Sequence, residues 1–244
     1  MAQIKKGTKK PVQKVVYPKK ENYQGRVLEE SPLQKTLIKQ AKFITSAATA
    51  KQFITPDKPM IAVCGKSNVG KSSFINMLAN QKRLAKTSSA PGRTRLVNYF
   101  DFGTFILADL PGYGFARVSK AEKIKWAKTL EDFFKNKDDI AHVFMLADSR
   151  HDPTEDDVQM IEFLHYHVLP FSVVLTKADK LSKMKIKEHI KAIAADLYLG
   201  EGNLIATSAE TGYGKEQVLE KIATVIRLCE EQKDEPMDEE GEEE

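Results

Sequence analysis

MIAVCGKSNVGKSSFINML, residues 60–78, joins an apolar strand-like run to a helical stretch through the loop GKSNVGKS at 65–72. This loop matches the pattern G-x-x-x-x-G-K-[ST] in the strand-to-helix setting that the pattern requires. Its glycines let the backbone wrap closely enough for N–H groups to point at phosphate oxygens, and the helix N-terminus adds its dipole. The segment therefore predicts a phosphate-binding loop within an α/β fold.

Two side chains of this loop have predicted roles in binding a nucleotide. We expect Lys71 to hold the β- and γ-phosphates and Ser72 to ligate Mg²⁺. The flanking strand and helix disfavour the alternative of an ordinary glycine-containing turn. The loop alone does not distinguish ATP from GTP, or a kinase from a hydrolase.

Apolar runs alternate with amphipathic helical stretches from about residue 41 onward. The expected strands are 41–46, 60–64, 96–101, 104–109, 142–148, 171–177 and 203–207. The expected helices are 71–79, 184–199, 215–229 and two that begin at capping boxes, Ser119 with Glu122 and Thr154 with Asp157. LVNYFDF and TFILADL, joined through Gly103, predict a hairpin. This alternation predicts a three-layer α/β domain with a mostly parallel sheet and one antiparallel edge hairpin.

A base-recognition motif follows a later strand, in FSVVLTKAD at residues 171–179. The Asp179 carboxylate accepts hydrogen bonds from the guanine ring N–H and exocyclic amine together, a pair of donors that adenine lacks. Lys177 is expected to lie along the base plane. TSA at 207–209 closes another strand, and the backbone of its last two residues is expected to meet the guanine carbonyl. The pattern predicts a guanine nucleotide.

Between these motifs lies DLPG at 109–112, at the end of an expected strand. Asp109 is expected to hold the Mg²⁺ shell through water, and the Gly112 amide to donate to the γ-phosphate only while that phosphate is present. Upstream, PGRTR at 91–95 places the Thr94 hydroxyl where it completes the metal shell. Loss of the γ-phosphate would release both segments.

GKSNVGKSS, PGRTR, DLPGYGFA, DSRHDPTEDD, TKAD and TSA, in this order across about residues 40–230, resemble the EngB (YihA/YsxC) family of ribosome-assembly GTPases. The resemblance implies a single Ras-like G domain that binds GTP or GDP with Mg²⁺ and hydrolyses GTP slowly. It also implies a role in assembling the large ribosomal subunit in bacteria, with the subunit precursor and its rRNA as partners. A link to cell division and septation is part of the same implication.

The motifs together define a set of candidate site residues. Those expected to contact the nucleotide are Gly65, Lys66, Ser67, Asn68, Val69, Gly70, Lys71, Ser72, Ser73, Gly92, Arg93, Thr94, Arg95, Leu96, Asp109, Leu110, Pro111, Gly112, Thr176, Lys177, Ala178, Asp179, Thr207, Ser208 and Ala209. Catalytic roles are predicted for Lys71, Thr94, Gly112 and Asn68, and metal contacts for Ser72, Thr94 and Asp109.

Tyr113 stands where Ras-like enzymes have the Gln that orients the attacking water, so we predict slow intrinsic turnover that a partner or an ion accelerates. Tyr113 is instead either a hydrophobic gate or an RNA-facing contact. Asn68 stands where several similar P-loop GTPases use Asn to help bind K⁺. Its alternative role is only to tolerate the geometry of the loop.

Charge divides the chain, whose formal net charge is +4. Residues 1–20 carry seven Lys and no acid, whereas residues 230–244 carry ten acids and one Lys. Both ends are too charged and too poor in apolar side chains to offset their ordering entropy. We therefore predict a basic disordered arm at 1–25, the G domain at 26–230 and an acidic disordered tail at 231–244. The arm either contacts RNA or only solubilises the chain.

Within the body, basic residues gather in two segments, 81–95 and 117–128, each with five positive charges. The first segment contains Thr94, and the second follows DLPG. They are therefore the parts of the chain that a γ-phosphate would order. Our hypothesis is that GTP presents this positive charge to ribosomal RNA and that hydrolysis withdraws it. The alternative is that exposed loops are commonly charged.

The composition excludes several classes of protein. Cys64 and Cys229 are too few for a disulfide scaffold or a Cys-rich zinc site, and they favour a reducing, cytoplasmic setting. The longest apolar runs fall far short of the ~20 residues of a bilayer helix, so no membrane span is expected. We expect a monomer.

Two competing functions follow from the same motifs. One is a GTP-regulated interaction protein of the division machinery, in which hydrolysis is secondary. The other, a P-loop kinase, is disfavoured because TKAD and DLPG together specify a base and a switch rather than an acceptor pocket.

Overall fold

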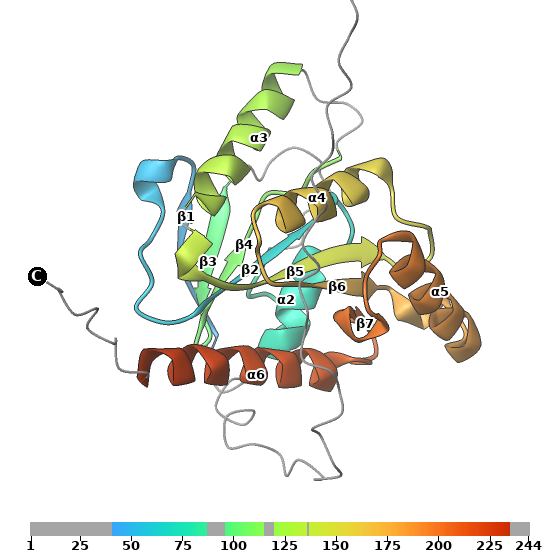
Figure 1. The fold of residues 1–244 in the computed structure, drawn as a ribbon. Helices are drawn as coiled ribbons and strands as arrows, with labels where there is room; N and C mark the ends of the chain where they lie inside the picture. The colour runs from blue at the N-terminus through green and yellow to red at the C-terminus, as the bar shows by residue number, and fades with distance from the viewer. Residues whose placement is uncertain (1–40, 87–95, 115–119, 136, 235–244) are drawn as a thin grey trace, which may run out of the picture.

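The computed structural model describes residues 41–86, 96–114, 120–135 and 137–234 (Figure 1). The predicted basic arm and most of the predicted acidic tail therefore lie outside the described residues. So do four candidate site residues, Gly92, Arg93, Thr94 and Arg95. Within the described ranges, no helix has the length and apolar character needed to cross a membrane.

Seven strands form one sheet within the described residues, in the order β1-β3-β4-β2-β5-β6-β7. They are β1 (Lys42–Ala47), β2 (Met60–Gly65), β3 (Val97–Asp101), β4 (Ile106–Asp109), β5 (Ile140–Asp148), β6 (Phe171–Thr176) and β7 (Leu204–Ala206). The predicted hairpin is present, because β3 runs antiparallel to β4. It is not the edge of the sheet, since β1 pairs antiparallel with the outer side of β3.

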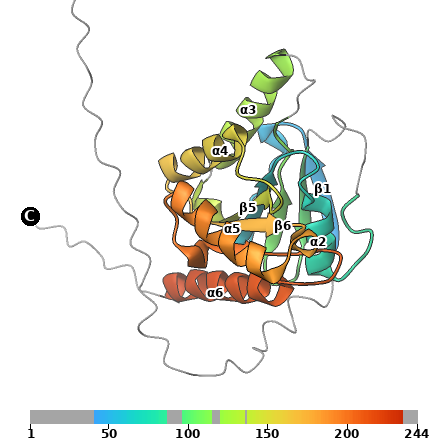
Figure 2. The same cartoon turned by 90° about the vertical axis from the view of Figure 1, so that its right-hand side faces the viewer.

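Helices cover both faces of this sheet, which confirms the predicted three-layer α/β fold (Figures 1 and 2). They are α2 (Lys71–Ala79), α3 (Lys120–Phe134), α4 (Glu155–Tyr166), α5 (Lys183–Asp196) and α6 (Lys215–Asp234). The buried residues form two clusters, one between the sheet and α3, α4 and α5, and one between the sheet and α2 and α6. Each cluster is the core of one interlayer space.

The ends of two helices differ from the expected ones. α5 ends at Asp196, three residues early, because the chain turns through Tyr198 in the left-handed region at φ 54°. α6 continues to Asp234, so the helix includes residues that the charge pattern assigned to the acidic tail. An Arg227–Glu231 ion pair at i,i+4 lies in this last part of α6 and is compatible with helix there.

The buried His142 of β5 makes the stability of the fold depend on pH. Its Nε2 lies 3.0 Å from the Ser172 hydroxyl. Burial, with a smaller effect of Lys221, lowers the pKa of His142 from 6.5 to about 3. Between these values the unfolded chain binds a proton that the folded protein does not bind. The free energy of unfolding should therefore fall as pH falls, by at most about 1.4 kcal/mol per pH unit.

Urea unfolding at about pH 7 and about pH 5 measures this contribution. His142→Gln should lose less stability on acidification than the unmodified protein, by about 2 kcal/mol at most. The matched control is His151→Gln, which replaces an exposed histidine and should leave the loss unchanged. Equal losses in all three proteins would contradict the assignment of this pH dependence to His142.

Candidate functional site

The phosphate-loop motif forms the connection between β2 and α2. Gly65 is required by close packing, because a Cβ there would lie 2.7 Å from the Leu146 carbonyl oxygen. Gly70 caps α2 with φ 112°, and its carbonyl accepts the Phe74 N–H at 2.8 Å. The loop also bends back on itself, since Lys71 Nζ donates to the Gly65 carbonyl at 3.3 Å.

The end of β6 is bonded directly to this loop. The Thr176 hydroxyl donates to the Val69 carbonyl at 2.7 Å. Lys177 ends the strand because its φ is 60°, and its Nζ donates to the Asn68 carbonyl at 3.0 Å and to Asp148 Oδ2 at 2.9 Å. The base motif and the phosphate-loop motif are therefore hydrogen-bonded directly to each other.

Asp148 is a site residue that the motif analysis missed. It ends β5, and Arg150 donates a hydrogen bond to each of its carboxylate oxygens, from Nε at 2.9 Å and from Nη2 at 2.7 Å. Partial burial opposes its ionisation, but hydrogen bonds from Arg150 and Lys177 outweigh that effect and hold the pKa of Asp148 well below its usual value. The signal was its place as the first residue of DSRHDPTEDD, directly after a strand.

Asp179 lies in the turn after Lys177 and is held from two sides. Lys180 Nζ lies 2.9 Å from one carboxylate oxygen, and the Ser208 hydroxyl donates to the other at 2.7 Å. The hydrogen bond from Lys180, followed by that from Ser208, lowers the pKa of Asp179. The carboxylate is therefore an ionised acceptor with a fixed orientation. The Ser208 N–H already donates to the Tyr213 carbonyl at 3.0 Å, which favours Ala209 as the backbone donor to a base.

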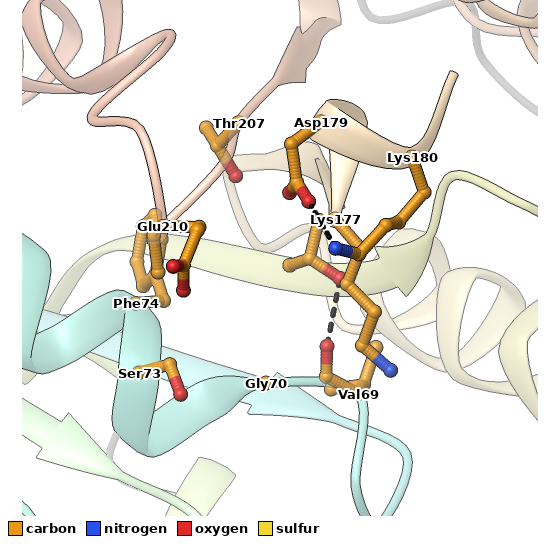
Figure 3. A pocket seen from close by; sticks show the side chains of 11 residues that line it. Val69, Gly70, Ser73, Phe74, Lys177, Asp179, Lys180, Thr207 and Glu210 are labelled. Atoms are coloured by element: carbon orange, nitrogen blue, oxygen red, sulfur yellow. Dashed lines mark hydrogen bonds and ion pairs between the residues drawn. The ribbon is translucent and has the colours of Figure 1, made fainter.

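A cavity of about 190 Å³ lies between these two motifs (Figure 3). Val69, Gly70 and Ser73 border it on the side of the phosphate loop, and Asp179 and Thr207 border it opposite them. Its full lining is Val69, Gly70, Ser73, Phe74, Thr176, Lys177, Asp179, Lys180, Thr207, Ala209 and Glu210. Of these, Phe74, Lys180 and Glu210 were not among the candidates from sequence.

Residues 109–114, here called the switch segment, leave β4 beside the phosphate loop. Asp109 is buried, and burial raises its pKa while the nearby Lys71 ammonium and Asn98 oppose that shift. Asn98 Nδ2 lies 3.5 Å from Asp109 Oδ2. Among the described residues, Asp109 Oδ1 and Ser67 Oγ are buried with no hydrogen-bond partner. Both are acceptors suited to a cation or a polar ligand group.

Gly112 of the switch segment packs against the phosphate loop. A Cβ at this position would lie 2.9 Å from Lys71 Nζ and 2.9 Å from Ser67 Oγ, so only glycine fits without a shift. The next residue, Tyr113, has a relative exposure of 3%. The hypothesis of an RNA-facing Tyr113 is therefore wrong, because the apolar ring is packed into the core. Trp126 lies edge-to-face on this ring and donates its Nε1–H to the Pro111 carbonyl at 3.1 Å.

The remaining candidates divide into those that join the site and those that support it. Ser72 and Ser73 lie in the first turn of α2. Lys66 points away from the loop toward α4, where its Nζ lies 3.5 Å from Asp156 Oδ2. Leu96 precedes β3 and is half-buried. Leu110, Ala178 and Thr207 are buried and fix the backbone around the site.

Comparison with known proteins agrees with this arrangement. The model of a family described as "50S ribosome-binding GTPase" matches residues 60–177. A probable GTP-binding protein EngB from Pelotomaculum thermopropionicum is 47% identical over 193 residues, which cover 78% of this chain and 98% of the relative. Another from Geobacillus kaustophilus is 44% identical over 182 residues, covering 74% of this chain and 93% of the relative.

Solved structures give the same result. The crystal structure of a probable GTP-binding protein engB superposes with a TM-score of 0.60 and 25% identity, covering 69% of this chain and 99% of that one. Era from Aquifex aeolicus, bound to GDP and AlF4⁻, shares the fold with a TM-score of 0.56 over 68% of this chain and 56% of that one, at 21% identity. The expected family is confirmed: with a Ras-like fold and close relatives along most of its length, this chain belongs to the EngB family of GTP-binding proteins and is a GTPase.

Proposed function

We propose that this GTPase binds GTP at the carboxyl ends of β2, β4, β6 and β7 and acts as a nucleotide-gated factor in assembly of the large ribosomal subunit. The observation that carries the proposal is that Asp109 lies near Lys71 beside the phosphate loop, while Asp179 lines the cavity that Val69, Gly70 and Ser73 border from that loop. Ligands of open α/β sheets bind at this edge.

At the phosphate end, the loop amides and the Lys71 ammonium would hold the β- and γ-phosphates. Ser72, Asp109 and Thr94 would hold Mg²⁺, with Thr94 placed by sequence alone. The residues present fit the ion, because Asp109 Oδ1 is a buried acceptor without a partner among the described residues. When bound, Mg²⁺ neutralises negative charge on the phosphates.

At the base end, the Asp179 carboxylate would accept the two guanine donors, while Ser208 and Lys180 keep it oriented. Lys177 would line the base plane, held there by Asn68 and Asp148. The Ala209 amide would donate to the guanine carbonyl. Adenine lacks this pair of donors and would leave the ionised Asp179 carboxylate unpaired, so the site would select guanine over adenine.

The intrinsic rate of hydrolysis should be slow, because no side chain at position 113 faces the attacking water. Tyr113 points into the core instead. Single-turnover hydrolysis of GTP by the purified protein measures the rate, and comparison of KCl with NaCl tests whether K⁺ accelerates it. The backbone of Asn68 has φ 63°, which fits its alternative role of tolerating the loop geometry.

The ribosomal role draws on the family description and on basic charge in the connection that follows α2. The side chains of Lys82, Arg83 and Lys86 are exposed. They lie between the end of α2 and residues 87–95. Basic side chains bind RNA phosphates and release counterions, so such binding weakens as salt rises. We expect co-sedimentation with large subunits and their precursors to be stronger with a non-hydrolysable GTP analogue than with GDP, and weaker at raised salt.

A matched triple variant, with Lys82, Arg83 and Lys86 replaced by Gln, should reduce this co-sedimentation and its salt dependence without changing GDP affinity. Replacing Lys183, Lys185 and Lys187 of α5 by Gln removes the same charge elsewhere and is the control. Binding that is indifferent to the nucleotide would contradict gating. That outcome would favour the alternative of a protein partner, such as the division machinery.

A further inference from the structure

Tyr113 forms a buried polar contact that the nucleotide site does not use. Its hydroxyl donates to Asp157 Oδ1 at 2.8 Å, and both side chains are buried. Burial, with nearby acidic groups, raises the pKa of Tyr113 far above its usual value, so the phenol keeps its proton and donates. The contact joins the switch segment to α4.

Asp157 cannot move freely, because the start of α4 holds its other oxygen. The Thr154 N–H donates to Asp157 Oδ2 at 3.0 Å, and the Thr154 hydroxyl donates to it at 2.7 Å. This is half of the capping box that the sequence predicted. Lys66 of the phosphate loop reaches the same helix start, with its Nζ 3.4 Å from the Thr154 hydroxyl. The Tyr113 hydroxyl is therefore bonded to a fixed acceptor.

The backbone of Tyr113 is bonded to the phosphate loop at the same time. The Ser67 N–H donates to the Tyr113 carbonyl at 2.9 Å, and Lys66 and Tyr113 form a parallel β-bridge. Gly112 thereby lies close to Lys71 and Ser67, since a Cβ built on it would stand 2.9 Å from Lys71 Nζ and from Ser67 Oγ. The switch segment thus occupies the space on this side of the Lys71 ammonium, and one loop amide is already used.

We propose that the Tyr113–Asp157 hydrogen bond holds the switch segment in this docked position, which a triphosphate must displace and a diphosphate need not. Tyr113 and Asp157 are then positioning residues that set the preference of the protein for GDP over GTP. The inference rests on the proposed function, because it requires the γ-phosphate to lie beside Lys71. If the binding-competent state is only a fraction of the population, the apparent affinity for GTP falls by that fraction.

The test compares the dissociation constants of GDP and a non-hydrolysable GTP analogue, measured by calorimetry on the full chain with Mg²⁺. Tyr113→Phe keeps the ring and removes the donor. We expect its affinity for the GTP analogue to rise about tenfold relative to GDP, the size of effect of one hydrogen bond to a charged acceptor. Tyr99→Phe is the matched control, since it removes the hydroxyl of another fully buried tyrosine, on β3, and should leave the ratio unchanged.

The melting temperature shows whether Tyr113→Phe folds. If it does not, the same measurement is made on Asp157→Ala. Both single variants and the double variant should shift the ratio by about the same factor, because each removes the Tyr113–Asp157 bond; Asp157→Ala also removes the cap at Thr154, which should lower its melting temperature. An unchanged ratio in folded variants that bind both nucleotides would overturn the inference and leave the proposed function intact. Failure of the unmodified protein to bind either nucleotide would instead overturn the proposed function.

Discussion

Lys71→Ala should lose GTP hydrolysis by a factor of about 100 or more, because it removes a cation that lies against both the phosphate loop and Asp109. Within the part of the chain that the structure describes, the ammonium bonds only to the Gly65 carbonyl, and burial lowers its pKa while Asp109 and Cys64 raise it. It is therefore a cation held ready for an anionic ligand. Affinity for GTP and GDP should fall with the rate, as measured by calorimetry and phosphate release.

Lys135→Ala is the control for this variant, since it removes an exposed lysine at the end of α3 that pairs with Asp132. Its hydrolysis and nucleotide affinity should match those of the unmodified protein. Melting temperatures of both variants separate loss of function from loss of fold. Hydrolysis at the full rate in a folded Lys71→Ala variant would mean that the phosphates bind elsewhere.

Parallel strands and the phosphate loop were predictable because their signals are local. FSVVLT of β6 is buried along its whole length, and a fully buried strand is a continuous apolar run in the sequence. The loop motif likewise needs only eight successive residues. The order of the strands was not predictable in this way. Periodicity says nothing about which edge β1 joins, so the hairpin was predicted at the edge that β1 occupies.

The contacts that organise the site were missed because they join residues distant in sequence. Tyr113 and Asp157 are 44 residues apart, and Asp148 and Lys177 are 29 apart. Each side chain, taken alone, looks like an ordinary polar residue near a strand or helix end. Only the crossover connections of the sheet bring them together at its carboxyl edge.

Asp157 shows how one residue can be predicted for a correct but incomplete reason. The spacing from Thr154 predicted a helix cap, and the cap is present. A capping carboxylate has a second oxygen, however, and a buried oxygen needs its own donor. Tyr113 supplies this donor, and it stands where Ras-like enzymes have the catalytic glutamine. The residue that replaces the glutamine is therefore the one that satisfies the second oxygen of Asp157.

Asp179→Asn should reverse the base preference of the site. Guanine offers a ring N–H and an amine, and the carboxylate accepts from both; the amide of Asn accepts one hydrogen bond and donates the other. Affinity for GDP should therefore fall roughly 10²- to 10⁴-fold, because one hydrogen bond is replaced by two opposed donors and the remaining one loses its charged acceptor. Xanthosine diphosphate has a carbonyl in place of the amine, so its affinity should rise in the variant. Calorimetry with both nucleotides measures the exchange.

Ser208→Ala is the matched control, because it leaves the carboxylate in place and removes only the hydroxyl that orients it at 2.7 Å. GDP affinity should fall about tenfold in this variant, and xanthosine diphosphate should gain nothing. Since Lys180 still contacts the other oxygen, Asp179 keeps part of its orientation. If Asp179→Asn weakened both nucleotides equally, Asp179 would act only through the local structure of its turn, and the cavity beside it would not be the guanine site.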